Sequence, residues 1–277
     1  MLKLMMITGD PGLAAFATAC GVQRIFVDLE INGKFERQGH RDTLISHHTM
    51  ADVARVRASI KGHQLLVRLN PDYAGSEAEI EAAIAAGADI LMLPMFTDLS
   101  AIRHFTKLIN GRCKFIPLIE TPAAAMLVPE LVREPGIDEL FVGLNDLHMA
   151  LGLDFMFELL ADGTVERIAA CCRNAGMAFG FGGIARMEEG HLPGKQVLAE
   201  HIRLGSSSVI LSRTFHRAST NLDELMTNFD FKREVEILRD YEKQLARSSA
   251  ERDTANHQAL LTAIISVRDA IRASKPR

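Results

Sequence analysis

The feature of this sequence that most restricts its fold is a repeated order of helix, glycine and short apolar run. In five places a helical segment closes on a glycine, and a strand-like run begins one to three residues later. Glycine readily adopts the left-handed conformation that ends a helix and turns the chain into the next strand. The five segments are ATACGVQRIFVDLE to Glu30, AIAAGADILMLPM to Met95, REPGIDELFVGLND to Asp146, CRNAGMAFGFGG to Gly183 and IRLGSSSVILS to Ser212.

Three further apolar runs bring the number of predicted strands to eight, namely LKLMMIT near the start, Gln64–Asn70 and Lys114–Thr121. The runs are continuous rather than alternating, which is typical of parallel strands buried on both faces. Helical segments separate nearly all of them, and 277 residues are enough for one large domain. We therefore predict an α/β fold, a (β/α)8 TIM barrel over residues 1–220, with a doubly wound open sheet as the weaker alternative.

The chain after residue 220 is a charged, helix-favouring segment whose apolar residues recur at helical spacing. It is longer than the single helix that closes a barrel. We predict a C-terminal helical segment over residues 221–277 that packs on its own barrel or on a neighbouring subunit, and its length favours a homo-oligomer.

Composition argues against two kinds of partner. The formal net charge is −4, and no run of Lys or Arg is long enough to follow a phosphate backbone, so we expect no nucleic-acid partner. No apolar segment reaches membrane-spanning length, and the short apolar start is not typical of a signal peptide. We expect no membrane partner and a cytoplasmic location.

Charged residues are expected to gather at one end of this barrel, because the active site of a (β/α)8 barrel lies at the carboxyl ends of its strands. Those expected there are Asp28, Glu30, Arg68, Glu120 and Asp146. Four carboxylates at one place repel each other unless a proton or cation compensates them, and oxygen ligands favour Mg²⁺ or Mn²⁺. Such carboxylates can instead cap the following helices. After Glu120, however, Thr121 and Pro122 already supply a cap and a first helical residue.

These residues resemble the HpcH/HpaI 2-oxo-acid aldolase and citrate lyase β-chain family, from about Arg24 to Phe215. The resemblance rests on VDLE, VRLN, GADILMLPM, PLIETPAA and ELFVGLNDLHMALG. The last two motifs are the most specific, because they combine an acid before Thr-Pro with a G-x-x-D-L-x-x-x-L-G turn at a matching separation.

The resemblance implies a metal-dependent carbon-carbon lyase that cleaves or forms a 4-hydroxy-2-oxo acid through a metal-bound pyruvate enolate. It implies that Glu120 and Asp146 bind Mg²⁺ or Mn²⁺ and that Arg68 faces the substrate oxygen. It also implies that Asp28 and Glu30 form an outer shell that holds metal-bound water. Such a cation acts as a Lewis acid, and an arginine adds an always-ionised donor.

Backbone N–H groups at the start of the helix after the sixth strand, around Leu144 and Asn145, are expected to bind the substrate carboxylate. Pro94, at the end of the fourth strand, is expected to line the substrate site. The aldolase branch of the family has a histidine base directly after the second-strand acids, where this chain has Ile31. The histidines that could replace it are His40, which we favour, His47, His48 and His148.

Three alternatives remain open. The first is a lyase for a CoA thioester of a hydroxy acid, so that the partner is either a 2-oxo acid or an acyl thioester. The second is an isomerase or synthase whose phosphate ligand binds at FGFGGIAR and GSSSVILSR, although glycines there can simply permit close packing. The third is a non-catalytic barrel. The retained carboxylates argue against it, because an unused cluster of buried charges destabilises a protein.

Overall fold

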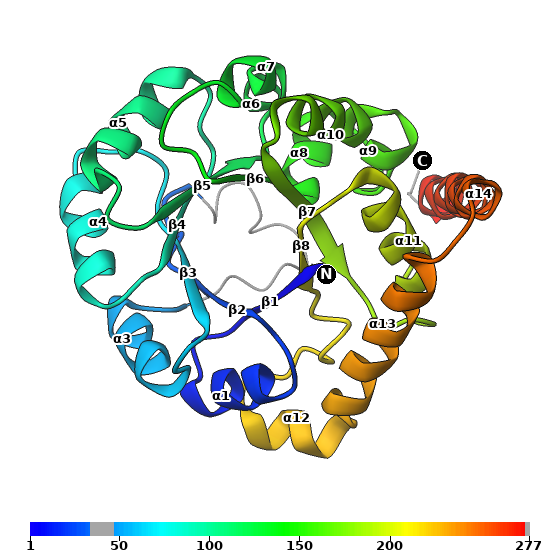
Figure 1. Ribbon diagram of the computed structural model, residues 1–277, viewed down its shortest axis with the longest axis horizontal. Helices are drawn as coiled ribbons and strands as arrows, with labels where there is room; N and C mark the ends of the chain where they lie inside the picture. The colour runs from blue at the N-terminus through cyan, green and yellow to red at the C-terminus, as the bar shows by residue number, and fades with distance from the viewer. Residues whose placement is uncertain (34–46, 275–277) are drawn as a thin grey trace.

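The computed structural model describes residues 1–33 and 47–274, and its strands form a closed parallel barrel in sequence order (Figure 1). The last strand pairs with the first, and the register joins Leu4 to Val209. The strands are β1 (Lys3–Ile7), β2 (Arg24–Asp28), β3 (Gln64–Arg68), β4 (Ile90–Leu93), β5 (Lys114–Ile119), β6 (Glu139–Val142), β7 (Ala178–Ile184) and β8 (Ser208–Leu211). The predicted (β/α)8 barrel is confirmed, and the open sheet is excluded.

Helices surround the barrel and return the chain between parallel strands (Figure 1). They are α1 (Pro11–Ala19), α3 (Met50–Ser59), α4 (Ser76–Ala85), α5 (Leu99–Ile109), α6 (Pro122–Met126), α7 (Val128–Leu131), α8 (Leu144–Ala150), α9 (Glu158–Ala161), α10 (Thr164–Ala175) and α11 (Gly194–Leu204). The five glycines of the repeated pattern all have a left-handed backbone, with φ from 67° to 96°. The pattern therefore has the conformational origin that the sequence suggested.

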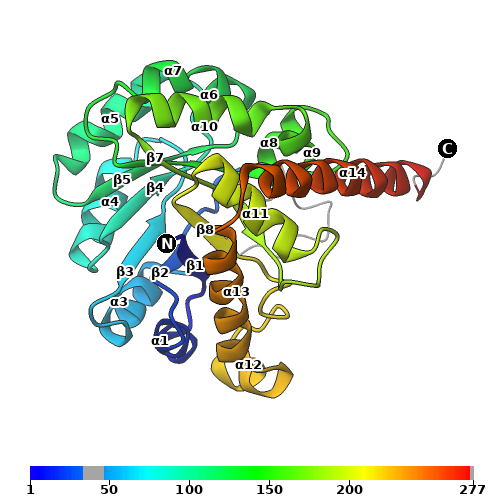
Figure 2. The ribbon, with the colours of Figure 1, turned by 45° about the vertical axis from the view of Figure 1, so that its right-hand side comes forward.

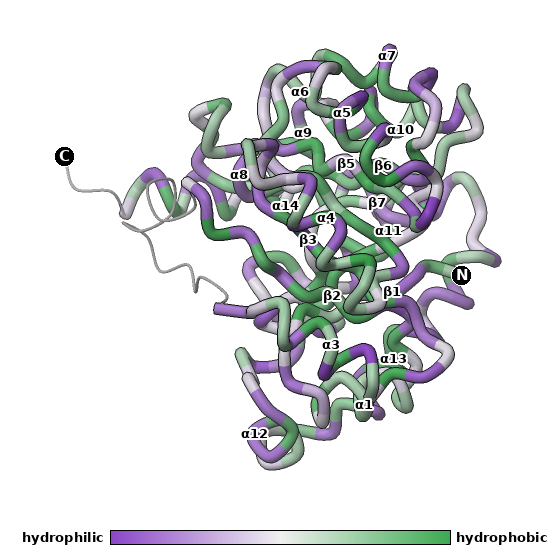
Figure 3. Tube along the Cα trace, turned by 90° about the vertical axis from the view of Figure 1, so that its left-hand side faces the viewer, coloured by the Kyte–Doolittle hydropathy of each residue, from purple (hydrophilic) through white to green (hydrophobic). Residues whose placement is uncertain are grey.

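The strands are apolar along their whole length because they are buried on both faces. Inside the barrel, residues such as Phe26, Met92 and Phe141 form one cluster. A larger cluster fills the space between the strands and the helices. Figure 3 shows the hydrophobic segments concentrated in the central strands. Truncating a fully buried aromatic such as Phe141 to Ala would cost about 3–5 kcal/mol of stability.

A buried ion pair, here called the amino-end pair, lies where the strands begin. Arg24, at the start of β2, is 1% exposed, and Glu139, at the start of β6, is 3% exposed. The guanidinium Nη2 of Arg24 donates to Glu139 Oε2 at 3.1 Å. Ser208 donates to the other carboxylate oxygen, and Arg24 also contacts Gln64 Oε1 at 3.4 Å. Lys3 Nζ lies 4.0 Å from Glu139 Oε2, so this buried carboxylate faces a close cation, a more distant one and neutral groups.

Helices α12 (Leu222–Asn228), α13 (Phe231–Leu245) and α14 (Ala250–Ser274) follow the barrel (Figure 2). Buried Phe231 of α13 packs against Phe16 of α1 and Phe215, so this helix rests on its own barrel. In Figure 2, α14 runs along α11 and α9, and its C-terminal end extends away from the barrel. The predicted helical segment is present, and subunit contact through it remains a prediction. No described helix is long and apolar enough to cross a bilayer.

Candidate active site

The carboxyl ends of the strands bring together the side chains that we call the mouth cluster: Asp28, Glu30, Arg68, Glu120 and Asp146. Asp28 and Arg68 are the last residues of β2 and β3, and Glu120 directly follows β5. β6 ends at Val142, and Asp146 lies in the first turn of α8, at the start of the helix after the sixth strand as expected. Gly143 forms the N-cap of this helix.

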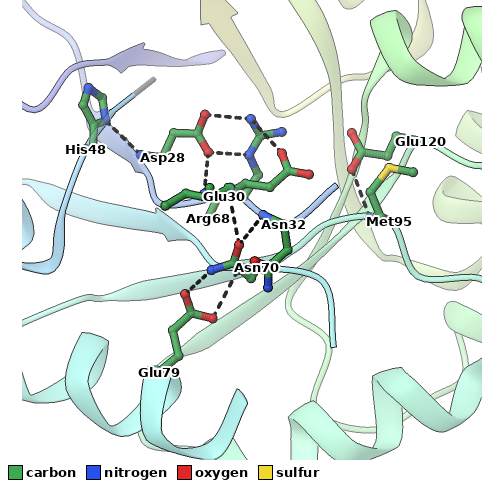
Figure 4. Close-up of polar contacts among 10 residues, drawn as sticks. Asp28, Glu30, Asn32, His48, Arg68, Asn70, Glu79, Met95 and Glu120 are labelled. Carbon is green, nitrogen blue, oxygen red and sulfur yellow. Dashed lines mark hydrogen bonds and ion pairs between the residues drawn. The ribbon is translucent and has the colours of Figure 1, made fainter. Parts of the chain in front are cut away.

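Arg68 is held by two acids of the β2 end (Figure 4). Its Nε and Nη2 atoms donate to the two oxygens of Asp28, both at 2.8 Å, and Nη2 lies 3.3 Å from Glu30 Oε2. The guanidinium carbon also lies 5.7 Å from the centre of the Phe26 ring. Burial alone would lower the pKa of Arg68, but the nearby carboxylates raise it, so this residue is a fixed cation.

Glu120 is a buried carboxyl among other acids of the cluster. It is 2% exposed, and its Oε1 accepts the N–H of Met95 at 3.0 Å. Burial raises the pKa of Glu120 to about 8; Arg68 opposes this shift, whereas the charges of Glu30 and Asp146 add to it. Near neutral pH this carboxyl therefore takes up a proton unless another cation approaches.

Gly143 lets Glu120 approach the turn that carries Asp146. A Cβ atom on Gly143 would lie 2.9 Å from Glu120 Oε2 and 3.0 Å from its Cβ. Leu144, in the next turn, is buried, and its side chain would crowd a Cβ on Gly182 of β7. Leu144 and Asn145, the two expected substrate contacts, thus lie in the first turn of α8. Because the side chain of Leu144 is buried, only its backbone N–H is available to a substrate.

Glycines of β7 have a packing role. A Cβ on Gly180 would lie 2.2 Å from Ser208 Oγ and 2.8 Å from the ring of Phe141. Gly182 is left-handed, with φ of 46°. Close packing therefore accounts for these two glycines without a phosphate ligand, which weakens the phosphate alternative.

The loops of the mouth are supported by a residue that the sequence did not single out. Glu79 of α4 accepts the side-chain N–H of Asn70 at 2.7 Å. The Oδ1 of Asn70 accepts the backbone N–H groups of Ile31 and Asn32, both at 2.9 Å. This chain of contacts fixes the segment after Glu30. A carboxylate within a helix gives no sequence signal for such a role.

The histidines differ in placement. His40 lies outside the described residues, and His47 is exposed. His48 Nδ1 accepts the backbone N–H of Asp28 at 3.1 Å, so neutral His48 carries its proton on Nε2. His148 was expected in a loop but is buried in α8, where Nδ1 contacts the Leu144 carbonyl at 3.1 Å. It therefore donates from Nδ1, the reverse of His48.

A separate cavity of about 760 Å³ opens at the amino ends of β3 to β6. Two of its carboxylates already have structural partners, since Asp89 accepts the N–H of Leu65 at 2.8 Å and Asp138 accepts that of Phe115 at 2.9 Å. We place the candidate site at the other end, where acids outnumber cations and strands of a barrel carry their chemistry.

The closed barrel of eight parallel strands and its surrounding helices define a protein of the (β/α)8-barrel class. The model of the family described as HpcH/HpaI aldolase/citrate lyase matches residues 11–192. The chain belongs to this family, whose members are lyases, and the match confirms the resemblance found in its motifs. A comparison with curated protein sequences finds no match.

Solved structures share the fold. A family member from Burkholderia cenocepacia has a TM-score of 0.62 at 16% identity, covering 86% of this chain and 95% of that one. The citrate lyase beta subunit of M. tuberculosis, complexed with oxaloacetate and magnesium, has a TM-score of 0.59 at 14% identity, covering 87% and 96%. Macrophomate synthase has a TM-score of 0.57 at 14% identity, covering 76% and 77%.

Proposed function

We propose that the protein is a divalent-metal-dependent carbon-carbon lyase that cleaves or forms a 4-hydroxy-2-oxo acid. Family membership supports a lyase. The complex of the M. tuberculosis citrate lyase beta subunit with oxaloacetate and magnesium supports a 2-oxo acid and a divalent cation as the ligands of this kind of barrel mouth. Glu120 and Asp146 are the metal ligands in this proposal, and Arg68 binds the substrate oxygen.

The observation that carries the proposal is the gathering of the buried carboxyls of Asp28, Glu30 and Glu120 around the cation of Arg68. The pKa of Glu120 is raised to about 8 by burial and by the neighbouring acids, although Arg68 is close. Hard carboxylate oxygens of this kind fit Mg²⁺ or Mn²⁺. Within the described residues no three His, Cys, Asp or Glu side chains form a metal site by themselves. Two carboxylates would leave room for substrate oxygens and water, as is usual for Mg²⁺.

The bound cation would supply Lewis-acid stabilisation of the negative charge that develops on the 2-oxo acid. The protein's own part is positional. Asp28 and Glu30 fix the Arg68 guanidinium, so that this donor need not reorganise as charge develops. Backbone N–H groups of Leu144 and Asn145 would orient the substrate carboxylate, and buried Pro94 would close the β4 side of the site.

A base must remove or return the proton of the substrate hydroxyl, and in this proposal His40 serves. The residue at the position of the family histidine is Ile31, which is 64% exposed and has no titratable group. A His40→Ala variant should lose turnover while it keeps metal and oxalate binding. Equal turnover of the variant and the parent would remove His40 from the mechanism.

The direct test is calorimetric titration of chelator-treated protein with Mn²⁺, with and without oxalate as an analogue of the 2-oxo acid. We expect Mn²⁺ to bind and oxalate to bind only with Mn²⁺. Glu120→Gln and Asp146→Asn should lose Mn²⁺ binding, whereas Glu130→Gln, which changes an exposed carboxylate on α7, should keep it. Oxalate binding without metal, or no metal binding by the parent, would contradict the proposal.

A further inference from the structure

Met95 has an unusual backbone conformation beside Glu120. Its φ of 54° lies in the left-handed region. This region is unfavourable for residues with a Cβ atom, and asparagine and aspartate tolerate it better than a long side chain does. Such a conformation persists only where its surroundings enforce it, and it is often found where a precise position matters.

Two hydrogen bonds to the β5 loop enforce this conformation. The N–H of Met95 donates to Glu120 Oε1 at 3.0 Å. The carbonyl of the next residue, Phe96, accepts from Thr121 Oγ1 at 2.9 Å, and this bond is buried. The strained φ of Met95 lies between the two bonded groups along the chain. Figure 4 shows Met95 beside the Glu120 carboxylate, on the opposite side of Arg68 from His48.

The other carboxylate oxygen of Glu120 points in a different direction. Oε2 is 2.9 Å from the position of a Cβ on Gly143, so it faces the turn that leads into Asp146. One oxygen is therefore fixed by the β4 loop and the other is directed at the β6 loop.

We propose that Met95 is a positioning residue, whose left-handed turn holds its N–H on Oε1 of Glu120 and so directs Oε2 toward Asp146. The inference rests on the proposed function, because this orientation matters only if the two carboxylates share a ligand. The side chain of Met95 has no part in it; the backbone conformation does.

Substitutions that differ in their tolerance of a left-handed backbone separate a role of the Met95 backbone from a role of its side chain. Met95→Gly and Met95→Asn tolerate it and should keep an Mn²⁺ affinity close to that of the parent. Met95→Val, being β-branched, should leave the conformation and lose the N–H contact. We expect its Mn²⁺ affinity to fall about 10- to 100-fold, as for other residues that orient metal ligands. Met95→Leu should resemble the parent.

If only side-chain packing mattered, the order of Mn²⁺ affinities would be reversed. Met95→Leu and Met95→Val would then bind Mn²⁺ about as the parent does, and Met95→Gly and Met95→Asn would bind it more weakly. That order would overturn the proposal. Asn110 provides a matched control, because it is left-handed with φ of 48° at the end of α5 and remote from the mouth. Asn110→Val should lower the unfolding midpoint by about 2–4 °C, much as Met95→Val does, but leave Mn²⁺ affinity unchanged.

A measurement without metal keeps the proposal distinct from the proposed function. In a double-mutant cycle, the loss of unfolding midpoint caused by Met95→Val should be smaller in a Glu120→Ala background, because the contact is already absent there. If the parent binds no Mn²⁺, the proposed function fails and this coupling still decides whether Met95 is held by Glu120. If Met95→Val lowers the unfolding midpoint equally in the parent and in the Glu120→Ala background, the proposed role of Met95 is overturned.

Discussion

Arg24 and Arg68 lie at opposite ends of the same barrel, and their surroundings differ in charge balance. At the amino end Arg24 faces the buried carboxylate of Glu139, which Lys3 and Ser208 also contact. At the mouth Arg68 lies among more acids than it can neutralise. A buried carboxylate that is paired with a cation is tolerated in a fold, whereas an excess of buried carboxylates destabilises it. The imbalance, rather than burial or the presence of an arginine, therefore distinguishes the end that carries the candidate site.

Breaking the amino-end pair should give the largest effect. Arg24→Met leaves buried Glu139 with only the half-exposed Lys3, 4.0 Å away, as a cation. The free energy of unfolding should therefore fall by about 3–5 kcal/mol, as measured by denaturant titration. Adding Glu139→Leu should recover most of this loss. Mn²⁺ affinity of the folded protein should not change, and a parallel loss of affinity would mean that the two ends are not independent.

At the mouth, Arg68→Lys should act on rate rather than on folding. A lysine keeps the charge but cannot make the two parallel bonds that Asp28 now accepts. We expect the turnover number to fall by about 10²- to 10³-fold, with Mn²⁺ affinity little changed. Steady-state kinetics and calorimetry on the same preparation would check this, and a near-normal rate would remove Arg68 from the mechanism.

The excess charge at Glu120 predicts a pH dependence of stability in the metal-free protein. The pKa of Glu120 is about 8 in the folded state and near 4.5 when unfolded. Between these values the unfolded chain loses the proton first, so stability falls as pH rises from about 4.5 to 8. Glu120→Gln should remove this fall.

The variant and the parent should unfold similarly at pH 5. At pH 8 the variant should be more stable, by on the order of 2–4 kcal/mol. Chemical denaturation at both values of pH measures the difference. The same shift in both proteins would show that Glu120 is not the group responsible.

The smallest predicted effect concerns Gly143. An added Cβ would press on Glu120 Oε2, so Gly143→Ala should lower Mn²⁺ affinity by about tenfold while the backbone φ of −84° accepts alanine readily. Gly62→Ala, at the amino end, meets nothing within 4 Å but is strained by its φ of 78°, so this contrast should cost stability and leave Mn²⁺ affinity unchanged. An unchanged affinity of Gly143→Ala would mean that Glu120 is not oriented by this turn.

Much of the fold was predictable because it depends on local patterns. Gly21, Gly87, Gly176 and Gly205 lie at helix ends as expected, since a left-handed residue is needed there whatever the rest of the chain does. Thr121 and Pro122 likewise begin α6. Gly136 is also left-handed, but it lies in a turn beyond α7, which ends at Leu131, so the expectation of a helix end was wrong there. Strand ends were less predictable. Apolar residues continue through β6 into α8, so periodicity gave no mark of the boundary at Val142.

The site was predictable only in part. Asp28, Arg68 and Glu120 could be placed because parallel strands bring their carboxyl ends to one edge. The left-handed Met95, the support of Asn70 by Glu79 and the close approach of Gly143 to Glu120 depend on contacts between distant segments. No spacing in the sequence encodes such contacts. They became visible only in three dimensions.

The residue that precedes β1 is hydrogen-bonded to α13, near the C-terminal end of the chain. Glu242 of α13 accepts the N–H of Leu2, and Arg239 donates to the carbonyl of the same residue. β1 also pairs with β8, so an incomplete chain on the ribosome has neither contact. We therefore expect the carboxylates of the mouth to converge only after synthesis has passed α13. Loading of the proposed cation would therefore follow folding instead of guiding it, and a nascent chain would offer competing ions no assembled site.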